Sequence, residues 1–206
     1  MLTLGPAAAD ARLAVILIHG RGASGDDMIG LAHELRVDDV RYLAPEAPGH
    51  TWYPNSFLSP IAQNEPGISN GLQRIATLID QLEQDGFAHT RIALIGFSQG
   101  ACLSLEFAAR HPRRYAAVIG LSGGLIGPPG TPRDYPGSMD GAPVLLGCSD
   151  VDPHIPVGRV RESAEVFRRM QATVDERIYP GMGHTVNHDE LTAVRALLAP
   201  PARPTR

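Results

Sequence analysis

The chain has 206 residues, 43% of them hydrophobic and 19% charged, a balance typical of one soluble globular domain with a buried core. Its net charge of −4, with no dense basic patch, argues against a nucleic-acid partner. No apolar run approaches the roughly 20 residues that a membrane-spanning helix needs.

The start of the chain and the two cysteines indicate a cellular compartment. Residues 1–10 lack the basic and apolar regions of a signal peptide. Cys102 and Cys148 lie in apolar surroundings, which favours buried, reduced thiols over a disulfide. No Cys or His spacing resembles a zinc site. We therefore expect a cytoplasmic protein without a bound metal.

Apolar runs of strand length alternate with segments of helical periodicity. The predicted strands are Leu13–Ile18, Val40–Ala44, Ile92–Ile95, Tyr115–Leu121, Val144–Leu146 and Val174–Tyr179. The predicted helices have apolar faces within 28–35, 68–82, 99–110, 160–170 and 191–198, the first of them capped by Asp26 or Asp27. This alternation predicts an α/β fold, a mostly parallel twisted sheet with helices on both faces.

Two irregular stretches interrupt this pattern. The loop 49–67 is long for a compact domain, and such loops are usually functional. The stretch 125–142 is rich in Gly and Pro and is too short and irregular to form a cap domain. We therefore expect a single domain over 1–206, with its core at about 12–198 and a frayed tail at 199–206.

The central motif is Gly-x-Ser-x-Gly at 96–100, between the strand Ile92–Ile95 and a helical segment. In that context the motif predicts a nucleophile elbow, a sharp strand-to-helix turn that exposes the hydroxyl of Ser98. The alternative is an ordinary turn serine. A serine nucleophile needs a base that takes its proton and an acid that orients the base.

The ends of later strands supply both partners. His184 follows the last strand in a Gly-x-Gly-His turn, whereas its nearest rival, His188, falls on the closing helix. Asp150 and Asp152 both follow the strand at 144–146, and we prefer Asp152, because Asp is also common as a turn former. The order Ser98, Asp152, His184 is the one that α/β-hydrolases use.

The oxyanion formed during carbonyl attack needs backbone N–H donors. Gln99, the residue after the nucleophile, provides one, and Arg21 in the glycine-rich turn 19–22 provides the other. Phosphate binding by that turn is discounted, because it lacks a Walker Lys-Ser/Thr pair. In the loop 49–67, His50, Trp52 and Tyr53 are candidate substrate contacts; core packing is the alternative for Trp52 and solvation for His50.

Together these motifs resemble the phospholipase/carboxylesterase family of α/β-hydrolases, which includes bacterial carboxylesterases and acyl-protein thioesterases. The resemblance runs from about residue 13 to 198. It rests on the following segments: His19–Gly22, Gly96–Gly100, Leu121–Gly123, Asp150–Pro156 and Gly183–His184. The family's acid falls on the aspartate directly before proline, Asp152, and its oxyanion donors fall on Arg21 and Gln99.

The resemblance implies a serine carboxylesterase that forms an acyl-enzyme, needs no cofactor and often forms a homodimer. Two features depart from the thioesterase pattern, namely Arg21 and the 50–53 stretch His-Thr-Trp-Tyr. Both favour a short-chain or aromatic ester. An acyl-protein thioesterase or lysophospholipase is the closest alternative, and a catalytically silent binding protein on the same fold is an alternative of another class.

Overall fold

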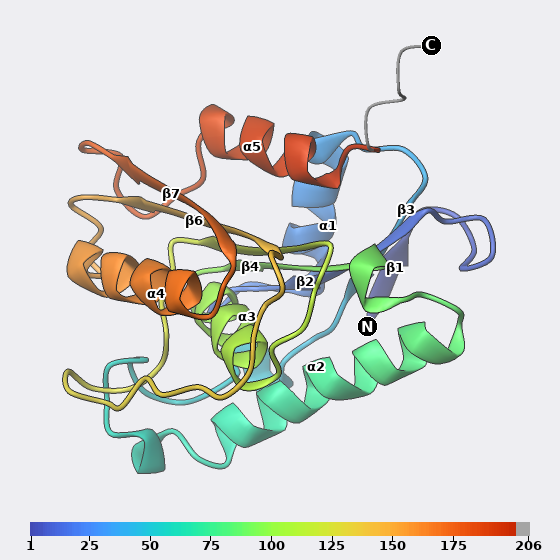
Figure 1. The fold of residues 1–206 in the computed structure, drawn as a ribbon. Coiled ribbons are helices and arrows are strands. Elements are labelled where there is room, and N and C mark those ends of the chain that lie inside the picture. Colours follow the sequence, from blue (N-terminus) through green and yellow to red (C-terminus); the bar gives the residue numbers. More distant parts are fainter. Residues whose placement is uncertain (201–206) are drawn as a thin grey trace.

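The computed structural model describes residues 1–200, which build one seven-stranded sheet flanked by helices (Figure 1). The strands are β1 (Leu2–Leu4), β2 (Leu13–Ile18), β3 (Val40–Ala44), β4 (Ile92–Phe97), β5 (Ala117–Leu121), β6 (Pro143–Ser149) and β7 (Thr173–Tyr179). The helices are α1 (Gly25–Leu35), α2 (Gly67–Gln84), α3 (Gln99–Arg110), α4 (Val157–Arg169) and α5 (His188–Leu198). Three single 3₁₀ turns cover Pro48–His50, Ile61–Gln63 and His89–Arg91.

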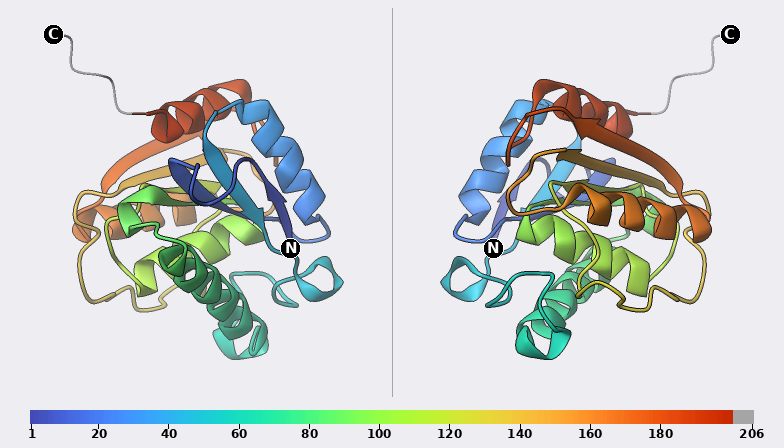
Figure 2. Two further views of the ribbon diagram at one scale, coloured as in Figure 1. Left: turned by 90° about the vertical axis from the view of Figure 1, so that its right-hand side faces the viewer. Right: turned by 90° about the vertical axis from the view of Figure 1, so that its left-hand side faces the viewer.

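The strand order is β1-β3-β2-β4-β5-β6-β7, and all neighbours are parallel except β1 and β3. The inner strands β2 and β5 are buried along their whole length, because helices cover both faces of the sheet. Helices α1 and α5 pack on one face, and α2, α3 and α4 lie on the other (Figure 2). The predicted α/β-hydrolase architecture is confirmed.

The residues between β5 and β6 form no helix or strand, so the expectation that the fold lacks a cap domain is also confirmed. None of the helices described over residues 1–200 has the length and apolar character needed to cross a bilayer. That 1–206 is a single domain stays a prediction, and most of the predicted frayed tail, 201–206, lies outside the described residues.

The structure corrects the prediction for four elements, α1, β1, β5 and β6. Helix α1 is capped by Ser24 rather than by Asp26 or Asp27, and Asp27 instead completes a capping box as the third helical residue. Strand β1 was not predicted, because three residues are too few to give a periodic pattern. Strand β6 extends beyond the predicted residues at both ends, whereas β5 starts two residues later than predicted.

Candidate active site

Ser98 stands at the turn between β4 and α3. Its φ of 54° and ψ of −117° are strained for a residue with a side chain, and its N–H donates to the Leu121 carbonyl at 2.9 Å. The turn depends on glycine, because a Cβ on Gly96 would lie 2.2 Å from the Gly100 carbonyl oxygen. A Cβ on Gly100 would lie 2.1 Å from the carbonyl oxygen of Ile18. The sequence therefore folds here into the predicted elbow.

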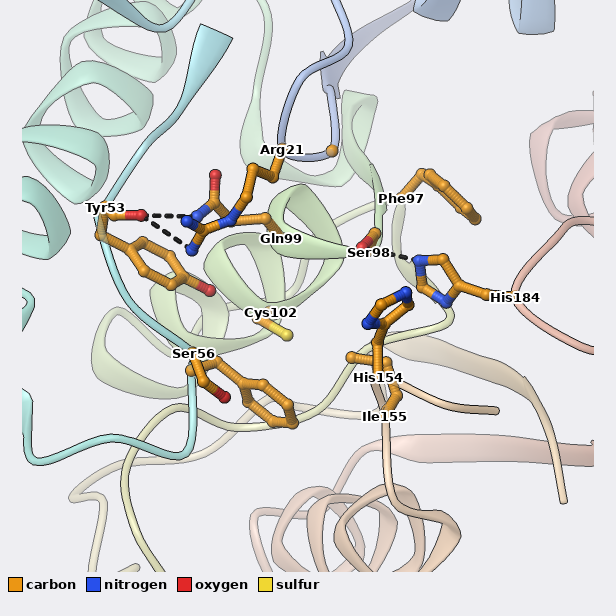
Figure 3. Close-up of a pocket in the computed structure, with 12 residues that line it drawn as sticks. Arg21, Tyr53, Ser56, Phe97, Ser98, Gln99, Cys102, His154, Ile155 and His184 are labelled. Carbon is orange, nitrogen blue, oxygen red and sulfur yellow. Dashed lines mark hydrogen bonds between the residues drawn. The ribbon is translucent and has the colours of Figure 1, made fainter. Parts of the chain in front are cut away.

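His184 lies within hydrogen-bond distance of both partners expected for a catalytic base. Its Nε2 is 2.8 Å from the Ser98 hydroxyl and its Nδ1 is 2.7 Å from Asp152 Oδ2 (Figure 3). An imidazole with its proton on Nδ1 donates to Asp152 and accepts from Ser98. The ring packs between Phe97 and His154, with centroid distances of 5.0 and 4.8 Å. These aromatic contacts restrict the orientation of the imidazole ring.

The two candidate acids occupy different environments. The Asp152 carboxylate is fully buried, and its Oδ1 accepts the backbone N–H groups of His154 and Ile155 at 2.8 and 3.0 Å. Burial alone would raise the pKa of Asp152, but the hydrogen bonds from His184 and these two N–H groups outweigh it and lower the pKa below its usual value. Asp150 is exposed and accepts the Gly181 N–H at 2.8 Å, which makes it a turn former.

The predicted oxyanion donors, Arg21 and Gln99, both line the cavity in front of Ser98. Among the described residues no acceptor takes the backbone N–H of either one. Gln99 is the first residue of α3, where N–H groups are free and the helix dipole favours negative charge. A Cβ on Gly20 would lie 3.2 Å from the Ser98 Cβ, so the turn that carries Arg21 runs tightly against the elbow.

The wall opposite His184 is formed by residues 52–57, which adopt no regular structure. The guanidinium of Arg21 donates to three successive carbonyls, those of Tyr53, Pro54 and Asn55, at 2.5–3.0 Å. The side-chain amide of Gln99 accepts the Trp52 N–H at 2.9 Å and donates to the Tyr53 carbonyl at 2.8 Å. Hydrogen bonds from polar side chains thus hold this segment, which has no regular backbone hydrogen bonds of its own.

A third amide secures the same loop from the other side. Asn64 is fully buried, accepts the Asn55 N–H at 2.8 Å and donates to the Ser56 carbonyl at 2.8 Å. The sequence did not predict that the side chains of Gln99, Arg21 and Asn64 hydrogen-bond this loop. A buried amide in a long loop leaves no periodic signal in the sequence. The only available signal was the side-chain type, because an amide can both donate and accept hydrogen bonds.

The cavity between the elbow and this wall has a volume of about 370 Å³. Its lining residues are Gly20, Arg21, Tyr53, Ser56, Phe57, Phe97, Ser98, Gln99, Cys102, His154, Ile155 and His184. The volume is near the lower end of the range of about 300–1,000 Å³ for small-molecule sites. Ser56, Phe57, His154 and Ile155 were not among the predicted site residues.

Of the three candidate substrate contacts, the structure places one in the cavity lining and two outside it. Tyr53 lines the cavity, whereas Trp52 is buried below it, donating from Nε1 to the His19 carbonyl at 2.9 Å. His50 is exposed outside the lining, with its Nδ1 3.0 Å from the Ala23 carbonyl oxygen. Trp52 therefore packs in the core and His50 is exposed to solvent, which are the two alternatives given above.

Both thiols are buried, and no disulfide joins them. Burial raises the pKa of Cys102 to about 12, so this cavity-lining thiol stays protonated and is a poor nucleophile. Within residues 1–200 no group of three His, Cys, Asp or Glu side chains is arranged to hold a metal ion. The expectation that the protein needs no cofactor or metal stays a prediction.

Comparison with known proteins identifies the family. The family model described as Phospholipase/Carboxylesterase matches residues 5–200. The chain belongs to this family. The crystal structure of a phospholipase/carboxylesterase from Dyadobacter fermentans superposes with a TM-score of 0.92 at 37% identity, over 96% of this chain and 94% of that one. The predicted resemblance is therefore confirmed.

Two further proteins are similar to this chain over nearly its whole length. The structure of esterase PE8 gives a TM-score of 0.80 at 28% identity, over 96% of both chains. Acyl-protein thioesterase 1 of Gibberella zeae is 29% identical, over 94% of this chain and 92% of its own length. As a member of this family the protein is an esterase-type hydrolase that acts on small-molecule esters.

Proposed function

We propose that the protein is a serine carboxylesterase that cleaves short-chain or aromatic esters through an acyl-enzyme. The observation that carries this proposal is the hydrogen-bonded chain from Ser98 through His184 to Asp152, with heavy-atom distances of 2.8 and 2.7 Å. A hydroxyl so close to an oriented imidazole can be deprotonated as it attacks a carbonyl carbon.

In the first half-reaction the Ser98 oxygen bonds to the ester carbonyl carbon while His184 Nε2 accepts the hydroxyl proton. The carbonyl oxygen becomes an oxyanion, which accepts hydrogen bonds from the N–H groups of Arg21 and Gln99. The Asp152 carboxylate, ionised because of its lowered pKa, stabilises the imidazolium. The intermediate then expels the alcohol, which takes the proton from His184.

In the second half-reaction a water molecule replaces the alcohol. His184 takes a proton from this water as its oxygen attacks the acyl carbon, and the same oxyanion donors hold the new intermediate. Collapse breaks the bond to Ser98, which recovers its proton from His184, and the carboxylic acid leaves. The low pKa of Asp152 keeps its charge available in both halves.

The cavity volume supports a short or aromatic acyl group. About 370 Å³ is shared by the reacting atoms and the whole substrate, and the wall at Tyr53 and Phe57 limits its depth. The alternative activity, as an acyl-protein thioesterase or lysophospholipase, would use the same steps with another leaving group. The similarity to the acyl-protein thioesterase 1 of Gibberella zeae supports the thioesterase alternative.

Hydrolysis of 4-nitrophenyl acetate, butyrate, octanoate and palmitate tests the proposal. We expect turnover that is highest with acetate or butyrate and falls by about 10⁴-fold or more in Ser98→Ala. Ser69→Ala, which alters an exposed serine on α2, serves as the matched control and keeps full activity. An optimum at octanoate or palmitate would favour the long-chain alternative.

Labelling with a fluorophosphonate probe separates the remaining outcomes. A wild-type protein that is labelled at Ser98 but hydrolyses none of these esters would act on another substrate class. An unlabelled, folded protein would support the silent binding protein instead. Ser98→Ala is expected to remain unlabelled in either case.

The buried, unpaired thiols Cys102 and Cys148 support the inferred cytoplasmic location, because reduced cysteines persist there. A homodimer stays a prediction. Light scattering during gel filtration would measure its mass directly.

A further inference from the structure

The hydroxyl of Tyr53 is a buried polar group at the end of the cavity far from His184. The residue is 2% exposed, and among the described residues its hydroxyl has no hydrogen-bond partner other than the weakly bonding thiol of Cys102. Among the buried polar atoms without a partner in residues 1–200, it is the one whose residue lines this cavity. Figure 3 shows the hydroxyl pointing toward Cys102 and the space in front of Ser98.

A buried hydroxyl without a good partner destabilises the fold, so its presence inside a substrate cavity points to a ligand atom that satisfies it. Its polar neighbour, the Cys102 thiol, is only a weak hydrogen-bonding group. Burial raises the pKa of Tyr53 well above its usual value, so the hydroxyl remains protonated and able to donate. A hydrogen-bond acceptor on the substrate would satisfy this donor better than the thiol does.

The chemistry of the site determines which half of the ester meets Tyr53. The leaving oxygen must face His184, because that imidazole returns the proton to it. The leaving group therefore extends on the side of His184 and His154. The acyl group then extends the other way, toward Tyr53 and Cys102 (Figure 3). Phe57 also lines the cavity.

We propose, on the basis of the serine-esterase function above, that Tyr53 selects short acyl groups that carry a neutral hydrogen-bond acceptor, such as an ether, keto or hydroxyl oxygen. The position of the hydroxyl is fixed, because the backbone carbonyl of Tyr53 accepts from both Arg21 and Gln99. Its backbone also packs on Gly67, where a Cβ would lie 2.9 Å from the Tyr53 Cα. A donor held this firmly discriminates between acyl groups at little entropic cost.

Pairs of esters that differ at one position of the acyl chain test this selection. 4-Nitrophenyl methoxyacetate has an oxygen where the butyrate has a methylene, and the 3-methoxypropanoate is related to the pentanoate in the same way. The ratio of kcat/KM within each pair is measured for wild type and for Tyr53→Phe. Dividing the two ratios removes the intrinsic reactivity of the esters.

We expect the preference for the ether ester to fall about 3- to 10-fold in Tyr53→Phe for at least one pair, the loss of one hydrogen bond. The matched control is Tyr42→Phe, because Tyr42 also has a buried, unpartnered hydroxyl but lies on β3 outside the cavity. That variant keeps the wild-type ratios. Equal ratios in wild type and a folded Tyr53→Phe for both pairs would overturn the proposal.

If Tyr53→Phe does not fold, wild type alone decides. Its ether preference is then compared with the ratio of the rates of alkaline hydrolysis of the same esters, and a preference no greater than this ratio overturns the proposal. Ser98→Ala is run on the butyrate in parallel. If it is inactive, a negative result concerns Tyr53 alone, whereas retained activity in Ser98→Ala contradicts the esterase mechanism itself.

Discussion

Ser98, Asp152 and His184 follow β4, β6 and β7, whereas the wall at residues 52–57 belongs to no helix or strand. The first group is positioned by parallel strands whose carboxyl ends meet at one edge of the sheet. The second is positioned by three polar side chains, those of Arg21, Gln99 and Asn64, which hydrogen-bond its backbone. We therefore expect reactivity to depend on the sheet that positions the first group, and the shape of the cavity to depend on a few side-chain hydrogen bonds.

This difference predicts two kinds of variant. Changes at the strand ends should lower turnover equally for every ester, whereas changes at the wall anchors should alter KM and the preference among acyl groups. A wall variant that lowered turnover of all esters equally would break this distinction.

Asp152→Asn is expected to have the largest effect. The amide cannot stabilise the imidazolium and favours the wrong tautomer of His184, so kcat should fall by about 10³- to 10⁴-fold for all esters. Asp150→Asn is the matched control, because its exposed carboxylate contacts Gly181 rather than His184. Steady-state kinetics that gave similar losses for both variants would contradict the assignment of Asp152.

Gln99→Ala keeps the backbone N–H but removes both hydrogen bonds to Trp52 and Tyr53. We expect kcat/KM to fall about 10-fold or more, chiefly through KM, with a lower melting temperature. The control is Gln63→Ala, which alters an exposed glutamine in the loop 49–67 that also carries Trp52 and Tyr53. An unchanged KM with a large loss of kcat would mean that Gln99 acts in the chemistry through its side chain.

Arg21→Lys keeps the charge but loses the planar group that spans three carbonyls. A loosened wall should admit longer chains, so the ratio of octanoate to butyrate turnover should rise about 3- to 10-fold. The chain-length series measures this ratio. An unchanged profile would show that residues 52–57 hold their shape without Arg21.

Glu190 is expected to have the smallest effect on activity, but it makes stability depend on pH. It is fully buried in the capping box of α5, the helix that follows the His184 turn. Burial, with the nearby negative charge of Asp189, raises its pKa from 4.5 to about 7, although its bond from the Asn187 N–H opposes the shift.

Between these values the folded protein binds more protons than the unfolded chain, so stability falls as pH rises from about 4.5 to 7. Glu190→Gln removes this loss. The difference in unfolding free energy between Glu190→Gln and wild type should increase by about 1–3 kcal/mol from pH 5 to pH 8. Urea denaturation at each pH measures it. Parallel pH dependences in the two proteins would assign the titration to another group.

The sequence predicted what depends on regular elements. Apolar runs located six of the seven strands, and the residues after them included Ser98, Asp152 and His184, which the structure brings into hydrogen-bond distance. Residues 52–57 could not be predicted in this way. Their course depends on long-range contacts such as that of Arg21 with three carbonyls, and such contacts leave no local pattern.

The same limit explains the corrections to single residues. Trp52 and Tyr53 are adjacent and both aromatic, yet one packs below the cavity and the other lines it. Which side each faces is decided by the hydrogen bonds of the loop, not by composition. Ser24 was missed as a cap because Asp26 and Asp27 are also good capping residues.

Strand β7 forms one edge of the sheet, and its residues Asp175, Glu176 and Arg177 are charged. Arg177 pairs with Asp175 at 2.8 Å, and Glu176 pairs with Arg168 of α4 at 3.0 Å. Charges along an edge strand discourage another chain from adding to the sheet by backbone pairing. We therefore expect the β7 edge to resist edge-to-edge aggregation, so that a dimer would form through another surface.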